Sequence, residues 1–224
     1  MRKDAPALMI TCEHASNAVP GFVVRAFKAA GLAGIPEDVL KTHRGYDIGA
    51  LKAFRKLVRA MRPDFSLEGT FSRLVADLNR SDTNRSFYSE YTRDLPESVM
   101  EQIHRMWLSH RDTVEKYVAG QVKGKGKGLR VIHLGIHSFT PVLGGVVRNA
   151  DVGILYDPAR EAECRIADAL IREIKARAPE LRIRRNYPYR GTSDGLTTAL
   201  RQKFGEAYAG IEIEMNQALL AALV

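Results

Sequence analysis

The chain has 224 residues, of which 45% are hydrophobic and 27% are charged, as is ordinary for a soluble globular protein that buries a sizeable core. Its two cysteines, Cys12 and Cys164, exclude a disulfide scaffold and a cysteine-based zinc site. The formal net charge of +8 admits either a nucleic-acid surface or a pocket for acidic small molecules.

The distribution of charged and apolar residues narrows the choice of partner and compartment. The one basic low-complexity stretch, residues 123–128, alternates lysine and glycine without aromatic residues, which predicts a solvated linker rather than a nucleic-acid surface. No stretch reaches the roughly 18 apolar residues of a membrane span, and residues 1–6 lack the apolar run of a secretory signal. We therefore expect a cytoplasmic protein that binds a small acidic molecule and neither nucleic acid nor membrane.

Strand and helix patterns alternate along the chain. Hydrophobic periodicity predicts, in order, a strand at 8–12, helices at 22–30 and 47–61, a strand at 69–78, a polar loop at 79–94, a helix at 97–122, a strand from 131 to 137, a strand at 152–156, a helix at 159–178, an edge strand at 181–185, a helix at 196–204 and a strand at 209–215. Because no repeat or break in composition interrupts this order, residues 1–224 are expected to form one α/β domain of three layers.

Two of the predicted strands end in a histidine. Glu13 and His14 follow the first strand, and the strand that starts at 131 ends in His137 and Ser138. Sites in open α/β sheets form outside the carboxyl ends of strands, so the two histidines suggest one shared site. A catalytic zinc takes three protein ligands, and the third could be Glu13 or Asp47. The alternative role of Asp47 is to cap the helix 47–61.

The last predicted strand carries a candidate general base. Glu212 and Glu214 share one face of this strand, because side chains alternate along it. They form either an acidic edge on the surface or a pair in which Glu214 faces a water activated by the metal. A carboxylate in that place would deprotonate the water and later protonate a leaving amine.

Arginines flank the run 72–80. Arg73 lies among apolar residues, where a guanidinium needs an anion, either a substrate or an internal salt bridge with Asp77. Asn79 and Arg80 follow the run and could hold a substrate carboxylate by a bidentate fork.

Five ordered motifs together resemble the N-formylglutamate amidohydrolase family, over nearly the whole chain. They are CEHASNAVP at 12–20, GYDIGA at 45–50, SRLVADLNR at 72–80, GIHSFTP at 135–141 and IEMN at 213–216. This family is similar to zinc carboxypeptidases and aspartoacylase-type deacylases, so the resemblance implies a three-layer α/β/α sandwich around a mixed, mostly parallel sheet and a single zinc ion.

The resemblance also implies the metal ligands. His14 matches the first ligand of the family and His137 matches the last. Three residues after the first histidine, the wider clan has a glutamate ligand, where this chain has Asn17. An amide is a poor zinc ligand, so the third ligand must come from elsewhere. We expect Asp47, with Glu13 as the alternative.

By the same resemblance, Arg73 polarises the scissile carbonyl, Asn79 and Arg80 hold the substrate carboxylate, and Glu214 is the general base. We also place Ser138 in the substrate site.

Arg148 either binds a second carboxylate of the substrate or lies on the surface, and Tyr189 is expected to line the pocket. The predicted activity is metal-dependent hydrolysis of a small N-acylated acidic amino acid, with N-formyl-L-glutamate as the leading substrate. The alternatives are another zinc-dependent deacylase or carboxypeptidase-like hydrolase, and a non-catalytic module that binds anions. The expected metal is zinc, with another divalent metal as the alternative. The sequence fixes neither the native metal nor the oligomeric state.

Overall fold

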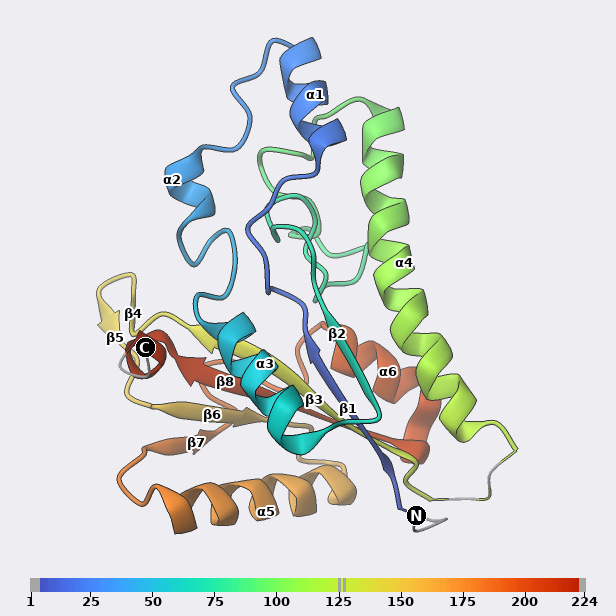
Figure 1. Ribbon diagram of the computed structural model, residues 1–224, viewed down its shortest axis with the longest axis vertical. Helices are drawn as coiled ribbons and strands as arrows, with labels where there is room; N and C mark the ends of the chain where they lie inside the picture. Colours follow the sequence, from blue (N-terminus) through green and yellow to red (C-terminus); the bar gives the residue numbers. More distant parts are fainter. Residues whose placement is uncertain (1–4, 125, 127, 222–224) are drawn as a thin grey trace.

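The centre of the protein is a six-stranded sheet (Figure 1). The computed structural model describes residues 5–124, 126 and 128–221, so residues 1–4 and two lysines of the basic stretch lie outside it. The strand order is β2-β1-β3-β8-β6-β7. Strands β2, β1, β3 and β8 are parallel, whereas β6 is antiparallel to β8. The strands are β1 (Ala7–Cys12), β2 (Phe65–Glu68), β3 (Val131–Phe139), β6 (Val152–Leu155), β7 (Ile183–Arg185) and β8 (Tyr208–Asn216).

Helices cover both faces of this sheet and complete the expected three-layer architecture (Figure 1). Helices α3 (Ala50–Met61) and α5 (Glu161–Arg177) pack on one face. Their apolar stripes meet residues such as Ile10, Ile136 and Ile213, which alternate along the strands. Helices α4 (Glu97–Val122) and α6 (Leu196–Phe204) pack on the other face, over Met9 and Tyr208. The α/β class and the mixed, mostly parallel sheet are confirmed.

A second packed region lies beyond the carboxyl ends of the parallel strands. It joins α1 (Gly21–Ala29), the segment 71–95 and the first half of α4 around Phe87, Ile103 and Trp107. The smaller elements are α2 (Glu37–Leu40), β4 (Val142–Leu143), β5 (Val146–Val147), a 3-10 turn (Gly205–Ala207) and α7 (Gln217–Ala221). None of the described helices is both long and apolar enough to cross a membrane.

The predicted strand at 69–78 is wrong, because the structure forms turns and loop there. The apolar side chains of this segment are buried, but its backbone polar groups bond to neighbouring loops rather than to a strand. The amide of Asp77 donates to the carbonyl of Phe87, and the hydroxyl of Thr92 donates to the carbonyl of Val75. When the backbone N–H and C=O groups of a buried loop are hydrogen-bonded in this way, the loop can be as apolar as a strand. Composition alone therefore did not distinguish the two. The edge position predicted for 181–185 is confirmed by β7.

Candidate metal site and substrate pocket

The carboxyl ends of three parallel strands, β1, β3 and β8, bring two histidines and Glu214 to one place. His14 follows β1, His137 lies near the end of β3, and these two strands are direct neighbours in the sheet. The ring centroids of the two histidines are 5.2 Å apart. Strand β8 pairs with β3 so that Glu214 lies opposite His137. The shared site expected from the strand ends is therefore present as a geometric cluster.

Asp47 completes a group of three buried side chains. Its Oδ2 atom lies 3.4 Å from Nδ1 of His14 and 3.0 Å from Nδ1 of His137. The backbone amide of Ser138 donates to the same oxygen. The alternative role of Asp47, as an N-cap, is not observed, since the N-cap of α3 is Gly49 and the helix has no side-chain cap. A left-handed φ of 83° at Gly49 lets the chain enter the helix while the carboxylate of Asp47 faces the histidines.

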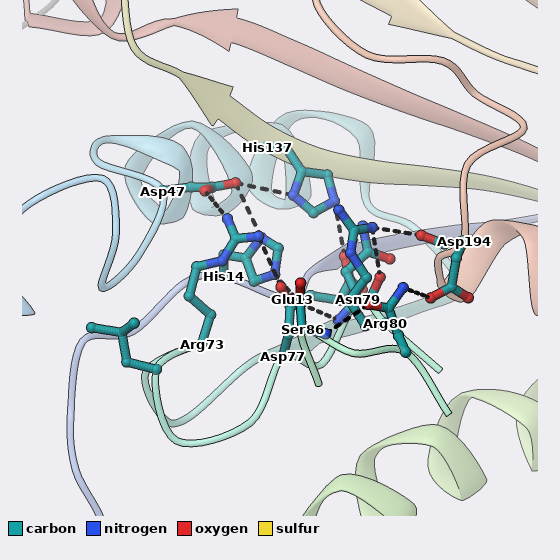
Figure 2. Close-up of polar contacts among 12 residues, drawn as sticks. Glu13, His14, Asp47, Arg73, Asp77, Asn79, Arg80, Ser86, His137 and Asp194 are labelled. Atoms are coloured by element: carbon teal, nitrogen blue, oxygen red, sulfur yellow. Dashed lines mark hydrogen bonds and ion pairs between the residues drawn. The ribbon is translucent and has the colours of Figure 1, made fainter. Parts of the chain in front are cut away.

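Two further carboxylates hold the outer sides of the imidazole rings. Nε2 of His14 lies 2.6 Å from Oδ1 of Asp77, and Nε2 of His137 lies 3.2 Å from Oε2 of Glu13 (Figure 2). Metal-ligating histidines commonly present one ring nitrogen to the metal and the other to a carboxylate. Glu13 therefore lies on the opposite side of the His137 ring from Asp47, which favours Asp47 as the third ligand.

The donor set fits a divalent metal ion. Ligand atoms of His14, Asp47 and His137 lie within 4.8 Å of one another, and all three side chains are buried. In a tetrahedral zinc site with bonds of about 2.0–2.1 Å, ligand atoms are about 3.3 Å apart, close to the two measured separations from Asp47. Nδ1 of His14 is buried without a hydrogen-bond partner in the part of the chain that the structure describes. A metal ion would supply that partner.

The charges of the cluster perturb its titrating groups. Burial alone would lower the pKa of His137, but the hydrogen bond with Asp47 and the contact with Glu13 raise this pKa well above its usual value. Burial, opposed by His137 and reinforced by the charges of Asp47 and Glu212, raises the pKa of Glu214 to about 8. The histidines and Arg73 lower the pKa values of Glu13, Asp47 and Asp77 despite their burial, so these three carboxylates stay ionised around the two imidazoles. Ionised carboxylates are what a cation site needs.

Arg73 pairs with the acids of the cluster. Its Nη2 atom lies 2.8 Å from Oδ2 of Asp77, and its Nη1 atom lies 3.4 Å from Oδ1 of Asp47. The internal salt bridge that the sequence left open is thus present. The side chain is still 27% exposed, and it lines the cavity beside the histidines. Its remaining N–H groups can face a ligand.

Asn79 and Arg80 lie across the same cavity, on the side of Asp194 (Figure 2). Oδ1 of Asn79 accepts from the amide of Leu196 at the start of α6, and its Nδ2 donates to Glu212. Nη1 of Arg80 donates to the carbonyl of Asp194 at 2.5 Å. These bonds orient the pair and engage only one terminal nitrogen of the guanidinium.

Glu212 and Glu214 both line this inner cavity, which has a volume of about 140 Å³. The surface-edge alternative is wrong for them, because β8 lies between β3 and β6 in the interior of the sheet. Oε2 of Glu214 is buried and has no hydrogen-bond partner among the described residues. With a pKa of about 8, this group is largely a protonated carboxyl at neutral pH in the metal-free protein. The positive charge of a metal ion on the neighbouring candidate ligands would lower this pKa, so that Glu214 could then accept a proton from a water.

The remaining predicted residues lie at the mouth of the cavity. The hydroxyl of Ser138 donates to the carbonyl of Ile48 and lines the cavity wall. Tyr189 lines the same wall and contacts Arg148 through its hydroxyl, at 3.2 Å from Nη1. Arg148 lines an adjoining cavity rather than the inner one.

Sequence reasoning missed three residues of the inner cavity and the full role of a further residue, Asp77. Arg190, Ser193 and Asp194 lie in the loop before α6, where no periodic pattern marks them. Asp77 was expected only as a salt-bridge partner, although its place in the SRLVADLNR motif offered a signal.

Comparisons with known proteins agree with the resemblance. The family model of N-formylglutamate amidohydrolase matches residues 6–221. The crystal structure of gene product Atu2144 from Agrobacterium tumefaciens is similar, with a TM-score of 0.74 and 31% sequence identity, over 96% of this chain and 82% of that one. No curated protein matches. A match over nearly the whole chain places this protein in the N-formylglutamate amidohydrolase family, a family of hydrolases that act on amide bonds.

Proposed function

We propose that this protein is a zinc-dependent amidohydrolase that converts N-formyl-L-glutamate to formate and L-glutamate. The observation that carries the proposal is the buried group of His14, Asp47 and His137, which lines the same cavity as Arg73, Arg80 and Glu214. Oε2 of Glu214 has no hydrogen-bond partner among the described residues. Membership of the family supplies the reaction class. The metal and the substrate are the proposed parts.

The three clustered side chains would hold the zinc ion through two imidazole nitrogens and one carboxylate oxygen. Glu13 and Asp77 would fix the rings and keep their outer nitrogens protonated, through the contacts at 3.2 and 2.6 Å. A bound zinc supplies Lewis acidity, which polarises an amide carbonyl and lowers the pKa of a nearby water.

Glu214 would act as the general base. Its unpartnered Oε2 takes a proton from the water as the new C–O bond forms at the formyl carbon. When the C–N bond breaks, Glu214 returns this proton to the leaving nitrogen. The hydroxyl group now on the formyl carbon gives the second proton of the water to Glu214, which passes it to the amine. The amine leaves as the ammonium group of glutamate, and the formyl carbon leaves as formate.

Two arginines would orient the substrate. Arg80, held by the carbonyl of Asp194, presents its free N–H groups to a carboxylate of the substrate, with Asn79 beside it. Arg73 offers an N–H group to the carbonyl oxygen as negative charge develops there. Because Arg73 is already oriented by two acids, little reorganisation is needed at that moment.

The test combines metal analysis with an assay of formate release. Protein purified without chelators should contain about one equivalent of zinc and should release formate from N-formyl-L-glutamate. His137→Ala should lose both properties. Asp47→Ala should lose the metal, whereas Glu13→Ala should only weaken its binding. Wild-type protein that binds no divalent metal would refute the proposal, and equal loss of metal in both acid variants would refute the ligand assignment.

A further inference from the structure

A second and larger cavity adjoins the inner one. It has a volume of about 520 Å³, against about 140 Å³ for the inner cavity, and this size is typical of a ligand-binding pocket. Asp47, Arg73, Ser138 and Tyr189 line both. We call this larger space the outer chamber. The candidate reaction centre therefore lies where two spaces meet, and a formyl group would leave the outer chamber unused.

The outer chamber is strongly cationic. Beyond the shared residues, its walls carry Arg44, Arg85, Arg93 and Arg148 but only two acids, Asp77 and Glu90, among the described residues. Asp77 is already paired with Arg73 and His14. Arg44 pairs with Glu90. Among the described residues, neither Arg85 nor Arg148 has an acidic partner at ion-pair distance. A cavity lined by uncompensated guanidinium groups attracts anions and accounts for part of the net positive charge.

Arg148 is held by aromatic rings and hydroxyl groups rather than by an acid. Its guanidinium lies 5.2 Å from the ring centroid of Tyr189 and 5.9 Å from that of Phe139. Nη1 contacts the hydroxyls of Thr140 and Tyr189, at 3.3 and 3.2 Å. The side chain is only half-buried, and no bond of its Nη2 or Nε to a described residue is present. Aromatic contacts of this kind position an arginine for a bidentate anion.

The supports of Arg148 are themselves fixed to the sheet. Its amide donates to the carbonyl of Pro141, which closes the hairpin of β4 and β5. The loop that carries Tyr189 is fastened by Asn186, whose side-chain oxygen accepts from the amides of Tyr156 and Gly191. Arg148 is therefore held in place before a ligand binds, which reduces the conformational entropy that its side chain and the neighbouring loops lose on binding.

We propose that the outer chamber is a subsite for a negatively charged acyl group, so that the enzyme also hydrolyses N-acyl amino acids whose acyl chain ends in a carboxylate. This inference rests on the proposed function, in which Asn79 and Arg80 hold the amino-acid side of the substrate in the inner cavity. The acyl side of the scissile amide then points past Arg73 and Ser138 into the outer chamber, where Arg148 and Arg85 receive its terminal carboxylate.

The experiment uses two pairs of compounds that differ by one charge. The acyl pair is N-glutaryl-L-glutamate and N-glutaramoyl-L-glutamate, in which an amide replaces the terminal carboxylate of the acyl chain. The amino-acid pair is N-formyl-L-glutamate and N-formyl-L-glutamine. The ratio kcat/KM is measured for the zinc-loaded wild type, Arg148→Gln, Arg85→Gln and the double variant. Kd is measured by calorimetry on the same four zinc-loaded proteins with Glu214→Gln added to each, so that the compounds are not hydrolysed during the titration. Arg172→Gln, which removes an exposed arginine of α5, is the matched control.

The wild type should bind the glutaryl compound about tenfold more tightly than the glutaramoyl one, equivalent to about 1.4 kcal/mol. Arg148→Gln should remove most of this preference, and Arg172→Gln should retain it. Equal binding of the acyl pair by the wild type would overturn the inference, as would a preference that survives in the double variant. The inference would also be overturned if the Arg148 and Arg85 variants lost their preference for the charged compound only in the amino-acid pair. The outer chamber would then bind the amino-acid side of the substrate rather than the acyl group. The binding result holds even if formate release fails, so the two proposals fail separately.

Discussion

The contact between Asp77 and His14 offers a direct test of how the protein would hold the proposed metal ion. Oδ1 of Asp77 lies 2.6 Å from Nε2 of His14 and also accepts the amide of Asn79 at 2.9 Å. In Asp77→Asn, an amide oxygen can keep both bonds, but the negative charge is lost and the new NH2 group faces Nη2 of Arg73. The substitution therefore changes charge while it preserves shape.

The expected loss of metal affinity follows from this geometry. A hydrogen bond to a charged group contributes roughly 1.5 kcal/mol more than one between neutral groups, which corresponds to about tenfold in affinity. Among the described residues, Arg73 then keeps Asp47 as its one acidic partner. The positive charge of Arg73 would compete with the metal ion for the carboxylate of Asp47, the proposed third ligand. We therefore expect zinc affinity to fall between about 10- and 100-fold.

Competition with a chelating indicator measures this affinity. The matched control is Asp151→Asn, because Asp151 pairs with Arg182 rather than with the metal group. This control should bind zinc like the wild type. Thermal unfolding of the metal-free proteins checks that Asp77→Asn is folded. Zinc affinity within threefold of the wild type in folded Asp77→Asn would refute the idea that this carboxylate supports a ligand.

Further predictions concern the general base, the substrate clamp and the stability of the fold. Glu214→Gln should retain its zinc while kcat falls by about 10²–10⁴-fold, and normal turnover would remove Glu214 from the mechanism. Arg80→Ala should raise KM for N-formyl-L-glutamate more than it lowers kcat; equal losses on an uncharged formyl amide would contradict a carboxylate clamp. Arg201→Met should lower the free energy of unfolding by about 1–3 kcal/mol in urea titrations, because the fully buried Glu163 loses the guanidinium 2.8 Å from its Oε1 and keeps Arg160, at 3.2 Å, as its charged partner among the described residues; a change below about 0.5 kcal/mol would show that the pair with Arg201 is dispensable. Burial lowers the pKa of His133 to about 4. Between pH 6.5 and pH 4 the unfolded chain binds a proton at this histidine and the folded chain does not, so the free energy of unfolding should fall by up to about 3 kcal/mol as the pH drops through this range. His133→Gln should flatten this part of the stability profile, and an unchanged slope would assign it to other groups.

Local patterns in the sequence were sufficient for most of the fold. The helices at 97–122 and 196–204 match α4 and α6, and the strand that starts at 131 matches β3. Periodicity works here because a side chain's burial follows from its position on one helix or strand. For the same reason, the two strand-end histidines could be identified before any contact between them was known.

Only the tertiary structure decided how the candidate site is assembled. The choice between Asp47 and Glu13 depends on which nitrogen of His137 each faces, and those side chains come from three segments. The segment 69–78 imitates a strand in composition, and only its partners in distant loops show that it is not one. The outer chamber likewise arises where the hairpin after β3 meets the loop of Tyr189. Composition and spacing record local burial, whereas these features depend on the distances that folding sets between remote parts of the chain.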